Sequence, residues 1–185
     1  VSTLAVVAGG LTICVAAGEF DLSVGTVASL SGIIVAGMMV RQGQSLEVAV
    51  VLALLSGVAF GIGFGLLVTM FRVPSLIATI GGSSVALGVN YAYAGGDSIY
   101  GQMPESFEFI GQGFIGAIPV SVIIALIVLV ILYLFLNKSR AGRYIIATGA
   151  NPKAAKLSGI STNRYRFLGL VVSGFFAALA GIMLT

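Results

Sequence analysis

The chain of 185 residues contains no histidine, no tryptophan and a single cysteine, Cys14. It therefore lacks imidazole for acid–base catalysis, the Cys and His ligands of zinc sites and any internal disulfide. Charge is scarce as well, because only nine Lys and Arg and six Asp and Glu are present. We expect no catalytic residue, no cofactor and no metal in this chain.

Apolar residues make up most of what is there. The chain is 58% hydrophobic and has 26 glycines in addition, whereas the two classes together make up about 45–50% of a typical soluble domain. The mean hydropathy is +1.14. Too few polar side chains remain to cover a water-soluble globule, so the composition predicts a membrane protein.

Uncharged stretches long enough to cross a bilayer recur along the chain, and a spanning helix needs about 18–20 apolar residues. None shows the two-residue alternation of a membrane-spanning β-strand, so we expect helices. The sequence predicts an all-α, polytopic membrane bundle with six spans, at 1–18, 22–40, 48–71, 73–96, 109–137 and 167–185. The chain begins without an initiator Met or charged leader and stops within an apolar run, which indicates that residues 1–185 are one transmembrane part of a longer protein.

The positions of the charges predict which side each loop faces. Segment 138–166 holds most of the bases, and no acid follows Glu108, so this loop is expected in the cytoplasm. Segment 97–117 carries three acids and no base, which places it on the outer side. Arg41 is then the one base on the wrong side. The bases of the cytoplasmic loop are Lys138, Arg140, Arg143, Lys153, Lys156, Arg164 and Arg166.

This basic loop has two general interpretations. Nucleic-acid binding is disfavoured, because a short loop between spans offers no soluble domain or groove-fitting element. Contact with anionic membrane lipid is an alternative that stays open.

A short helix with both of its ends specified lies within the loop. Asn151 suits the N-cap, Pro152 the first helical position and Gly159 the termination. A helix this short is unstable alone in water, so a partner surface is expected to hold it. Between these end signals lie Lys153, Ala154, Ala155, Lys156, Leu157 and Ser158.

Several blocks of the chain, in this order, resemble the membrane permease subunit of ribose-type ABC sugar importers. The blocks are Asp21-Leu-Ser-Val-Gly25, Val73-Pro-Ser-Leu-Ile-Ala-Thr79, Gly142-Arg-Tyr144, Gly149-Ala-Asn-Pro-Lys-Ala-Ala-Lys-Leu-Ser-Gly-Ile160 and Ser173-Gly through Ala177-Ala-Leu-Ala-Gly181. Three positions depart from the family pattern: Glu19-Phe20 replaces Gly-Ile, and Lys153 stands where relatives often carry Glu.

The resemblance implies a multi-pass protein of the bacterial inner membrane with about ten helices, of which this chain supplies the second to seventh. The loop 138–166 would hold the helix that docks into a cytosolic ATP-binding cassette ATPase. An extracytoplasmic sugar-binding protein and a second permease subunit, identical or different, are the other implied partners. The resemblance assigns ATPase coupling to residues 151–159.

Polar residues inside the apolar runs are candidates for the translocation pathway. Glu19 and Asp21 lie in a break between two runs, which suits either a helix cap at Asp21 or a discontinuous helix at an inner gate. The other candidates are Ser23, Ser83, Ser84 and Asn90. Glycines at 57, 61 and 65 favour close helix packing instead.

The sequence thus favours a transport subunit with no enzymatic activity of its own, since it contains no phosphate-binding loop. One alternative is an ion- or proton-coupled transporter or channel in which Glu19 and Asp21 titrate. Another is an ABC permease for nucleosides or branched-chain amino acids. A non-transporting membrane scaffold would leave the capped helix unexplained.

Overall fold

The computed structural model describes residues 1–97, 99, 101 and 104–185. This part of the chain is built of helices and one short hairpin. The helices are α1 (Ser2–Ala16), α2 (Val24–Val40), α3 (Leu46–Thr69), α4 (Ser75–Ala94), α5 (Glu105–Gln112), α6 (Val120–Lys138), α7 (Arg140–Ala150), α8 (Pro152–Leu157) and α9 (Thr162–Leu184). The hairpin strands are β1 (Phe114–Ile115) and β2 (Ile118–Pro119).

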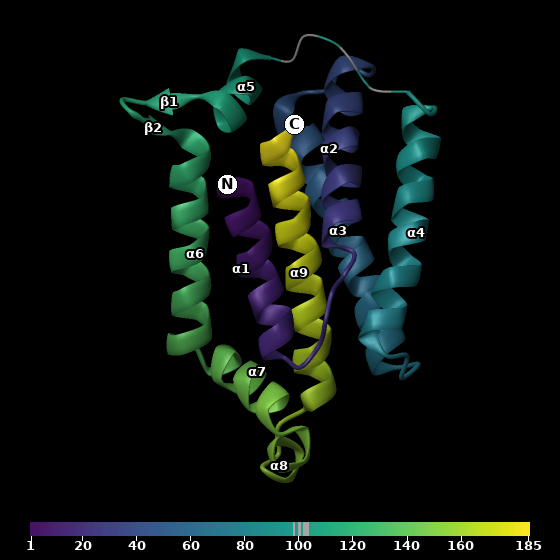
Figure 1. Cartoon of the computed structure of the whole chain (residues 1–185), viewed down its shortest axis with the longest axis vertical. Coiled ribbons are helices and arrows are strands. Elements are labelled where there is room, and N and C mark those ends of the chain that lie inside the picture. The colour runs from purple at the N-terminus through teal and green to yellow at the C-terminus, as the bar shows by residue number, and fades with distance from the viewer. Residues whose placement is uncertain (98, 100, 102–103) are drawn as a thin grey trace.

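The long helices run side by side along the molecule, and the short elements lie at its two ends (Figure 1). α7, α8 and the turn between α3 and α4 occupy the lower end, while α5, the hairpin and the turn between α2 and α3 occupy the upper end. The basic segment 138–166 and the described residues of the acidic segment 97–117 therefore lie at opposite ends of the molecule.

α9 is the central helix and packs against α1, α2 and α3. Its contact with α3 is made by glycines, because a Cβ at Gly57 would overlap the carbonyl of Gly174 and one at Gly61 would lie 2.8 Å from the carbonyl oxygen of Leu170. A Cβ at Gly65 would reach the ring of Phe167. The predicted close packing at these glycines is confirmed.

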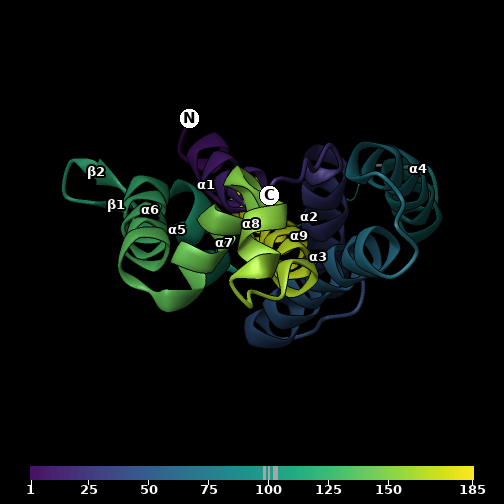
Figure 2. The same ribbon diagram turned by 90° about the horizontal axis from the view of Figure 1, so that it is seen from below.

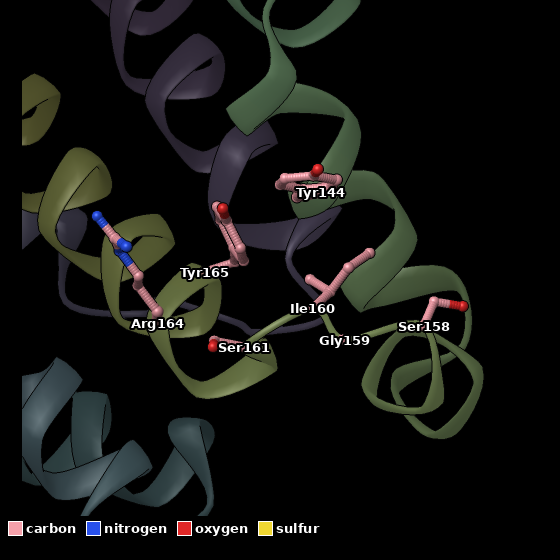
Figure 3. A pocket seen from close by; sticks show the side chains of 7 residues that line it. All are labelled: Tyr144, Ser158, Gly159, Ile160, Ser161, Arg164 and Tyr165. Atoms are coloured by element: carbon pink, nitrogen blue, oxygen red, sulfur yellow. The ribbon is translucent and has the colours of Figure 1, made fainter.

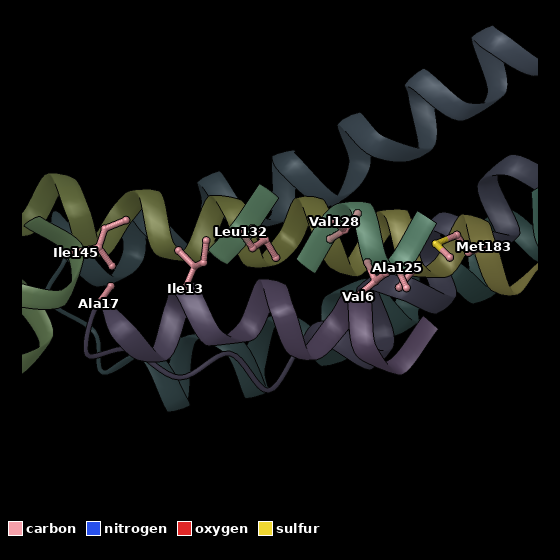
Figure 4. Packing of buried hydrophobic residues seen from close by; sticks show 9 residues of the cluster. Val6, Ile13, Ala17, Ala125, Val128, Leu132, Ile145 and Met183 are labelled. Carbon is pink, nitrogen blue, oxygen red and sulfur yellow. The ribbon is translucent and has the colours of Figure 1, made fainter. Parts of the chain in front are cut away.

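An apolar cluster joins α1, α6, α7 and α9 (Figure 4). Ile145 of α7 is fully buried in it, beside Ala17 at the end of α1. The cluster therefore fastens the lower crossing helix α7 to the long helices. Its buried members are Val6, Ile13, Ala17, Ala125, Val128, Leu132, Ile145, Ala180 and Met183.

α4 and α6 lie at opposite edges of the bundle (Figure 2) and expose large apolar side chains, among them Val85, Tyr91, Val130 and Ile131. Within the described residues, α3, α6 and α9 are long and apolar enough to cross a membrane, and α1 and α2 are shorter apolar helices. The fold is that of an α-helical membrane protein.

Two predicted boundaries are wrong. The span expected at 109–137 begins only at Val120, because residues up to Gln112 belong to α5 and the hairpin follows, with Phe114 opposite Pro119. Gly116 supplies the positive φ of +65° that its tight turn requires. The last span begins at Thr162 rather than at 167, so the final two bases of the predicted loop lie in α9.

Arg41, the base that opposes the charge rule, has a structural explanation. Its guanidinium donates hydrogen bonds to the backbone carbonyls of Tyr93 and Ala94, at 3.2 and 2.9 Å. These are carbonyls at the C-terminal end of α4, which lack helical partners and carry partial negative charge. Arg41 therefore provides hydrogen-bond donors to the last carbonyl groups of α4 at the upper end of the molecule.

Candidate functional site

α7 crosses the lower end of the bundle (Figure 2). Its first turn is capped by Ser139, whose Oγ accepts a hydrogen bond from the amide of Gly142 at 2.9 Å. Gly142, Ile145 and Thr148, spaced three residues apart, are its buried residues. One face of α7 is thus held against the bundle, which fixes the position where α8 begins.

The N-terminal end of α8 is formed as the sequence predicts. The Oδ1 atom of Asn151 accepts a hydrogen bond from the amide of Ala154 at 3.0 Å, and Pro152 occupies the first helical position. Pro is well suited to this position because its missing N–H would have had no helical partner.

The C-terminal end of α8 is also formed as predicted. Gly159 adopts a φ of +80°, its amide donates to the carbonyl of Lys156 at 3.1 Å, and the amide of Ile160 donates to the carbonyl of Ala155 at 3.0 Å. This pair of bonds defines a Schellman motif, which needs a left-handed residue that glycine adopts without strain.

α8 presents almost all of its side chains to solvent. Ala155 is the one residue of the helix that is buried, and it attaches α8 to the molecule. Leu157 is 90% exposed, although the exposed part of α8 is otherwise small or basic. Leu157 is thus an exposed apolar side chain that directly follows the exposed, basic Lys156. We call the α8 surface the exposed residues Lys153, Ala154, Lys156, Leu157 and Ser158.

Two hollows lie beside the α8 surface. The first has a volume of about 310 Å³ and is closed on one side by Tyr144 and Tyr165, whose ring centroids are 5.5 Å apart (Figure 3). The second, of about 400 Å³, is bordered by Lys156. Arg164 and Lys156 are the charged residues lining them, so these hollows suit acidic or hydrogen-bonding side chains of a partner. The first is lined by Tyr144, Ser158, Gly159, Ile160, Ser161, Arg164 and Tyr165.

Above α7, the chain between α1 and α2 is not helical (Figure 1). We call residues 17–23 the linker segment. Its conformation starts at Gly18, where a φ of +84° ends α1 and the amide of Glu19 donates to the carbonyl of Cys14 at 3.1 Å. The predicted break between the first two apolar helices is therefore present.

α4 supplies hydrogen-bond acceptors for the linker segment. The amide of Phe20 donates to Oγ of Ser75, and the amide of Leu22 donates to Oγ1 of Thr79, both at 3.2 Å. Ser75 and Thr79 are four residues apart and lie on one face of α4. Backbone that leaves a helix inside an apolar bundle needs such partners.

Both acids of the linker segment are buried, and they have different partners. Oε1 of Glu19 accepts a hydrogen bond from Nε of Arg166 in α9, in the one ion pair found among the described residues. Oδ1 of Asp21 accepts from the amide and the hydroxyl of Ser23, at 2.9 and 2.5 Å, while its Oδ2 atom has no hydrogen-bond partner among the residues that the structure describes.

The helix-cap interpretation of Asp21 needs correction. Ser23, rather than Asp21, occupies the N-cap position of α2, and the first turn of that helix receives no side-chain cap. Asp21 stabilises the turn that leads into the helix, because it binds the N-cap residue itself.

The linker segment also touches the chain just before α8. A Cβ at Gly149 would lie 2.9 Å from the amide nitrogen of Gly18 and would overlap the carbonyl of Ala16. The two stretches of backbone can approach this closely only because position 149 carries no side chain.

The other pathway candidates lie apart from the linker acids, on α4. Ser83 donates to the carbonyl of Thr79 within its own helix, at 2.8 Å, and Ser84 is exposed. Asn90 is buried and donates to Oγ of Ser29 in α2 at 2.9 Å. α4 is continuous at its glycines, and Gly82 allows close contact with Phe64.

Sequence reasoning missed Arg166 as the partner of Glu19, and Ser75 and Thr79 as acceptors for the linker segment. Two acids in an apolar break signal the need for a base, but seven bases clustered in one segment offered no way to choose among them. Across the described residues, no group of three or more His, Cys, Asp and Glu could hold a metal ion.

The family described as "Branched-chain amino acid transport system / permease component" matches residues 1–185. The chain is 36% identical to the ribose import permease protein of Bacillus subtilis over 180 residues, covering 97% of this chain and 56% of that protein.

Two further relatives match the chain with similar identity and coverage. The ribose import permease protein of Haemophilus influenzae is 35% identical, over 100% of this chain and 58% of its own length. The galactofuranose transporter permease protein of Escherichia coli is 34% identical, over 97% of this chain and 52% of its own length. The chain thus spans a little over half the length of these relatives. No solved structure matches it.

Proposed function

The chain belongs to the family of branched-chain amino acid transport system permease components, and on that basis we propose that it is part of the membrane subunit of an ATP-driven importer of monosaccharides. The observation that carries the proposal is the similarity to ribose and galactofuranose permeases along nearly the whole chain. The subunit is not an enzyme in this proposal, since a separate ATPase hydrolyses the ATP.

The proposed location is the inner membrane of a bacterium, with six passes in this chain out of about ten in the complete permease. Segment 138–166 faces the cytoplasm and segment 97–117 faces outward. The opposite ends at which these two segments lie support this orientation (Figure 1), as does the excess of bases in the first. An extracytoplasmic sugar-binding protein would approach the outer end, and a second permease subunit would complete the pathway.

α8 is the proposed coupling helix. Asn151, Pro152 and Gly159 shape it, and Ala155 attaches it to the bundle. The α8 surface then enters a groove of the cytosolic ATPase, with Leu157 in an apolar part and the lysines against acidic residues. Its support is the exposure of this surface and the basic hollows beside it.

Glu19, Asp21 and Ser23 form the proposed inner part of the pathway. Their burial within a non-helical linker segment supports a role in gating, because backbone outside a helix moves at lower cost than a packed helix. Ser83, Ser84 and Asn90 would contribute polar groups further along α4, toward its outer end.

The family description favours a second candidate for the solute, a branched-chain amino acid. The fold would be the same, and coupling would proceed through the same helix. Nucleosides remain a further alternative within this class, and an ion- or proton-coupled transporter is the alternative outside it.

The test uses the full-length permease, purified from membranes and reconstituted with its binding protein. We expect an ATPase to copurify and labelled ribose to be taken up only with ATP. Lys153→Ala with Lys156→Ala should lower ATPase affinity by about 5–30-fold, the effect of about 1–2 kcal/mol from two surface charge pairs. Competition by unlabelled leucine or nucleoside would identify the alternative solutes.

The matched control removes two other exposed bases of the same loop, with Lys138→Ala and Arg140→Ala. It should leave ATPase affinity near the wild-type value at constant ionic strength. Uptake driven by an ion gradient, with no ATPase bound, would contradict the proposal.

A further inference from the structure

We infer that the Glu19–Arg166 ion pair is the positioning contact through which movement of α8 reaches the linker segment. This inference rests on the proposed function, because it requires that α8 be displaced by an ATPase. Neither residue touches solute in this role. Both act on the placement of Asp21 and Ser23.

The linker segment is held by chain on both sides of α8. Gly149, two residues before Asn151, lies against the backbone of Gly18. Arg166 lies in the first turns of α9, shortly after the Schellman turn that ends α8, and binds Glu19. A displacement of α8 therefore pulls on residues 18 and 19 from two directions.

Burial makes the ion pair the stronger of these two attachments. The side chain of Glu19 is 3% exposed and that of Arg166 is 34% exposed. Separating them would leave a buried carboxylate without a counter-charge, which is strongly unfavourable. The two groups should therefore stay together and move as a unit when α9 tilts.

The attachment on the opposite side is weaker. Phe20 and Leu22 are bound to α4 by two neutral hydrogen bonds of 3.2 Å to hydroxyl groups. Charge-assisted hydrogen bonds are about twice as strong as neutral ones. Under load the bonds to Ser75 and Thr79 should therefore break first, so that the linker segment follows α9 and separates from α4.

The position of Asp21 makes that separation relevant to transport. Asp21 lies between the two amides that α4 holds, and its Oδ2 atom is buried without a partner. Separation from α4 would expose this oxygen and Ser23 to the space between the linker segment and α4. The ion pair thus positions Asp21 and Ser23 at the inner gate.

A purely structural role for the pair makes a different prediction, and a double variant separates the two. Glu19→Leu with Arg166→Met replaces the pair by apolar residues, which removes the cost of an unpaired charge and is often neutral for stability. If the pair only stabilises the fold, this variant should transport normally. If the pair positions the gate, the protein should fold and bind its ATPase but couple poorly.

The experiment measures solute taken up per ATP hydrolysed by the full-length permease in proteoliposomes with its ATPase and binding protein. For Glu19→Gln and for the double variant we expect ATPase binding to be retained, while uptake per ATP falls by about 5–150-fold, the usual range of coupling between two sites. Arg166→Lys, which keeps the charge, should recover part of the coupling.

Glu47→Gln and Arg140→Gln are the controls, because both residues are exposed and lie outside the ion pair. Normal uptake per ATP in the double variant would overturn the inference and leave the proposed function intact. Failure of the wild-type protein to bind an ATPase would instead overturn the proposed function. If Glu19→Gln alone does not accumulate in membranes, the double variant and Arg166→Lys still decide between the two roles.

Discussion

Gly61 at the crossing of α3 and α9 offers the sharpest test of the packing. In Gly61→Ala the new Cβ would lie 2.8 Å from the carbonyl oxygen of Leu170 and 2.8 Å from Cα of Val171. Ordinary contacts between carbon atoms are about 3.5–4.0 Å, so the helices must separate by roughly 1 Å. Both neighbours are backbone atoms and cannot rotate away.

Gly63 provides the matched control, because it lies on the same helix and a Cβ there would meet nothing within 4 Å. Both substitutions gain the same helix propensity, about 1 kcal/mol. The difference between them is therefore the cost of overpacking alone, about 1–3 kcal/mol. Since α9 carries Arg166, we also expect Gly61→Ala, but not Gly63→Ala, to lower uptake.

The assay is thermal denaturation of the detergent-solubilised protein, followed by the fraction that remains monodisperse. Each kcal/mol should separate the two midpoints by about 2–4 °C in a chain of this size. Equal midpoints for Gly61→Ala and Gly63→Ala would refute the reasoning, because they would show that α3 and α9 do not meet at Gly61.

Two further pairs of substitutions probe α8, the proposed coupling helix, and α4. Gly159→Val places a β-branched residue at a φ of +80°, which costs about 1–2 kcal/mol, and it should weaken ATPase coupling more than membrane insertion. Gly43→Val introduces the same residue at another positive φ, at the upper end, and should leave coupling unchanged. If Gly43→Val weakened coupling more than Gly159→Val did, α8 would be only a tether. Asn90→Ala and Ser29→Ala each remove the bond between α2 and α4 and should lower stability alike, by about 0.5–1.5 kcal/mol. A rise in the KM of uptake confined to Asn90→Ala would assign it to the pathway, and identical kinetics in both variants would remove it.

Local signals explain the parts of the site that could be predicted. The ends of α8 depend on Asn151, Pro152 and Gly159, each acting within a few residues, and all three behave as expected. The break between α1 and α2 follows from two acids in an apolar run. In both cases the determining contact is close in sequence.

The parts that were missed depend on distant residues or on backbone geometry. Glu19 and Arg166 are 147 positions apart, and the sequence offered several equivalent bases for the acid. The segment before α6 is as apolar as a span, yet it forms a hairpin because Gly116 turns the chain there. Hydrophobicity alone does not distinguish a membrane-spanning helix from such a hairpin.

The sequence by itself determined that this protein needs lipid, which end carries the positive charge and where the short helix α8 begins and ends. These properties follow from composition, from the sign of the charges and from capping, none of which requires knowledge of the packing. Only the tertiary structure decided which base neutralises Glu19, that α4 supplies the hydroxyls for the linker segment, and that Asn90 binds Ser29. The physical reason is that a buried polar group needs a partner, but its identity depends on which helices come together.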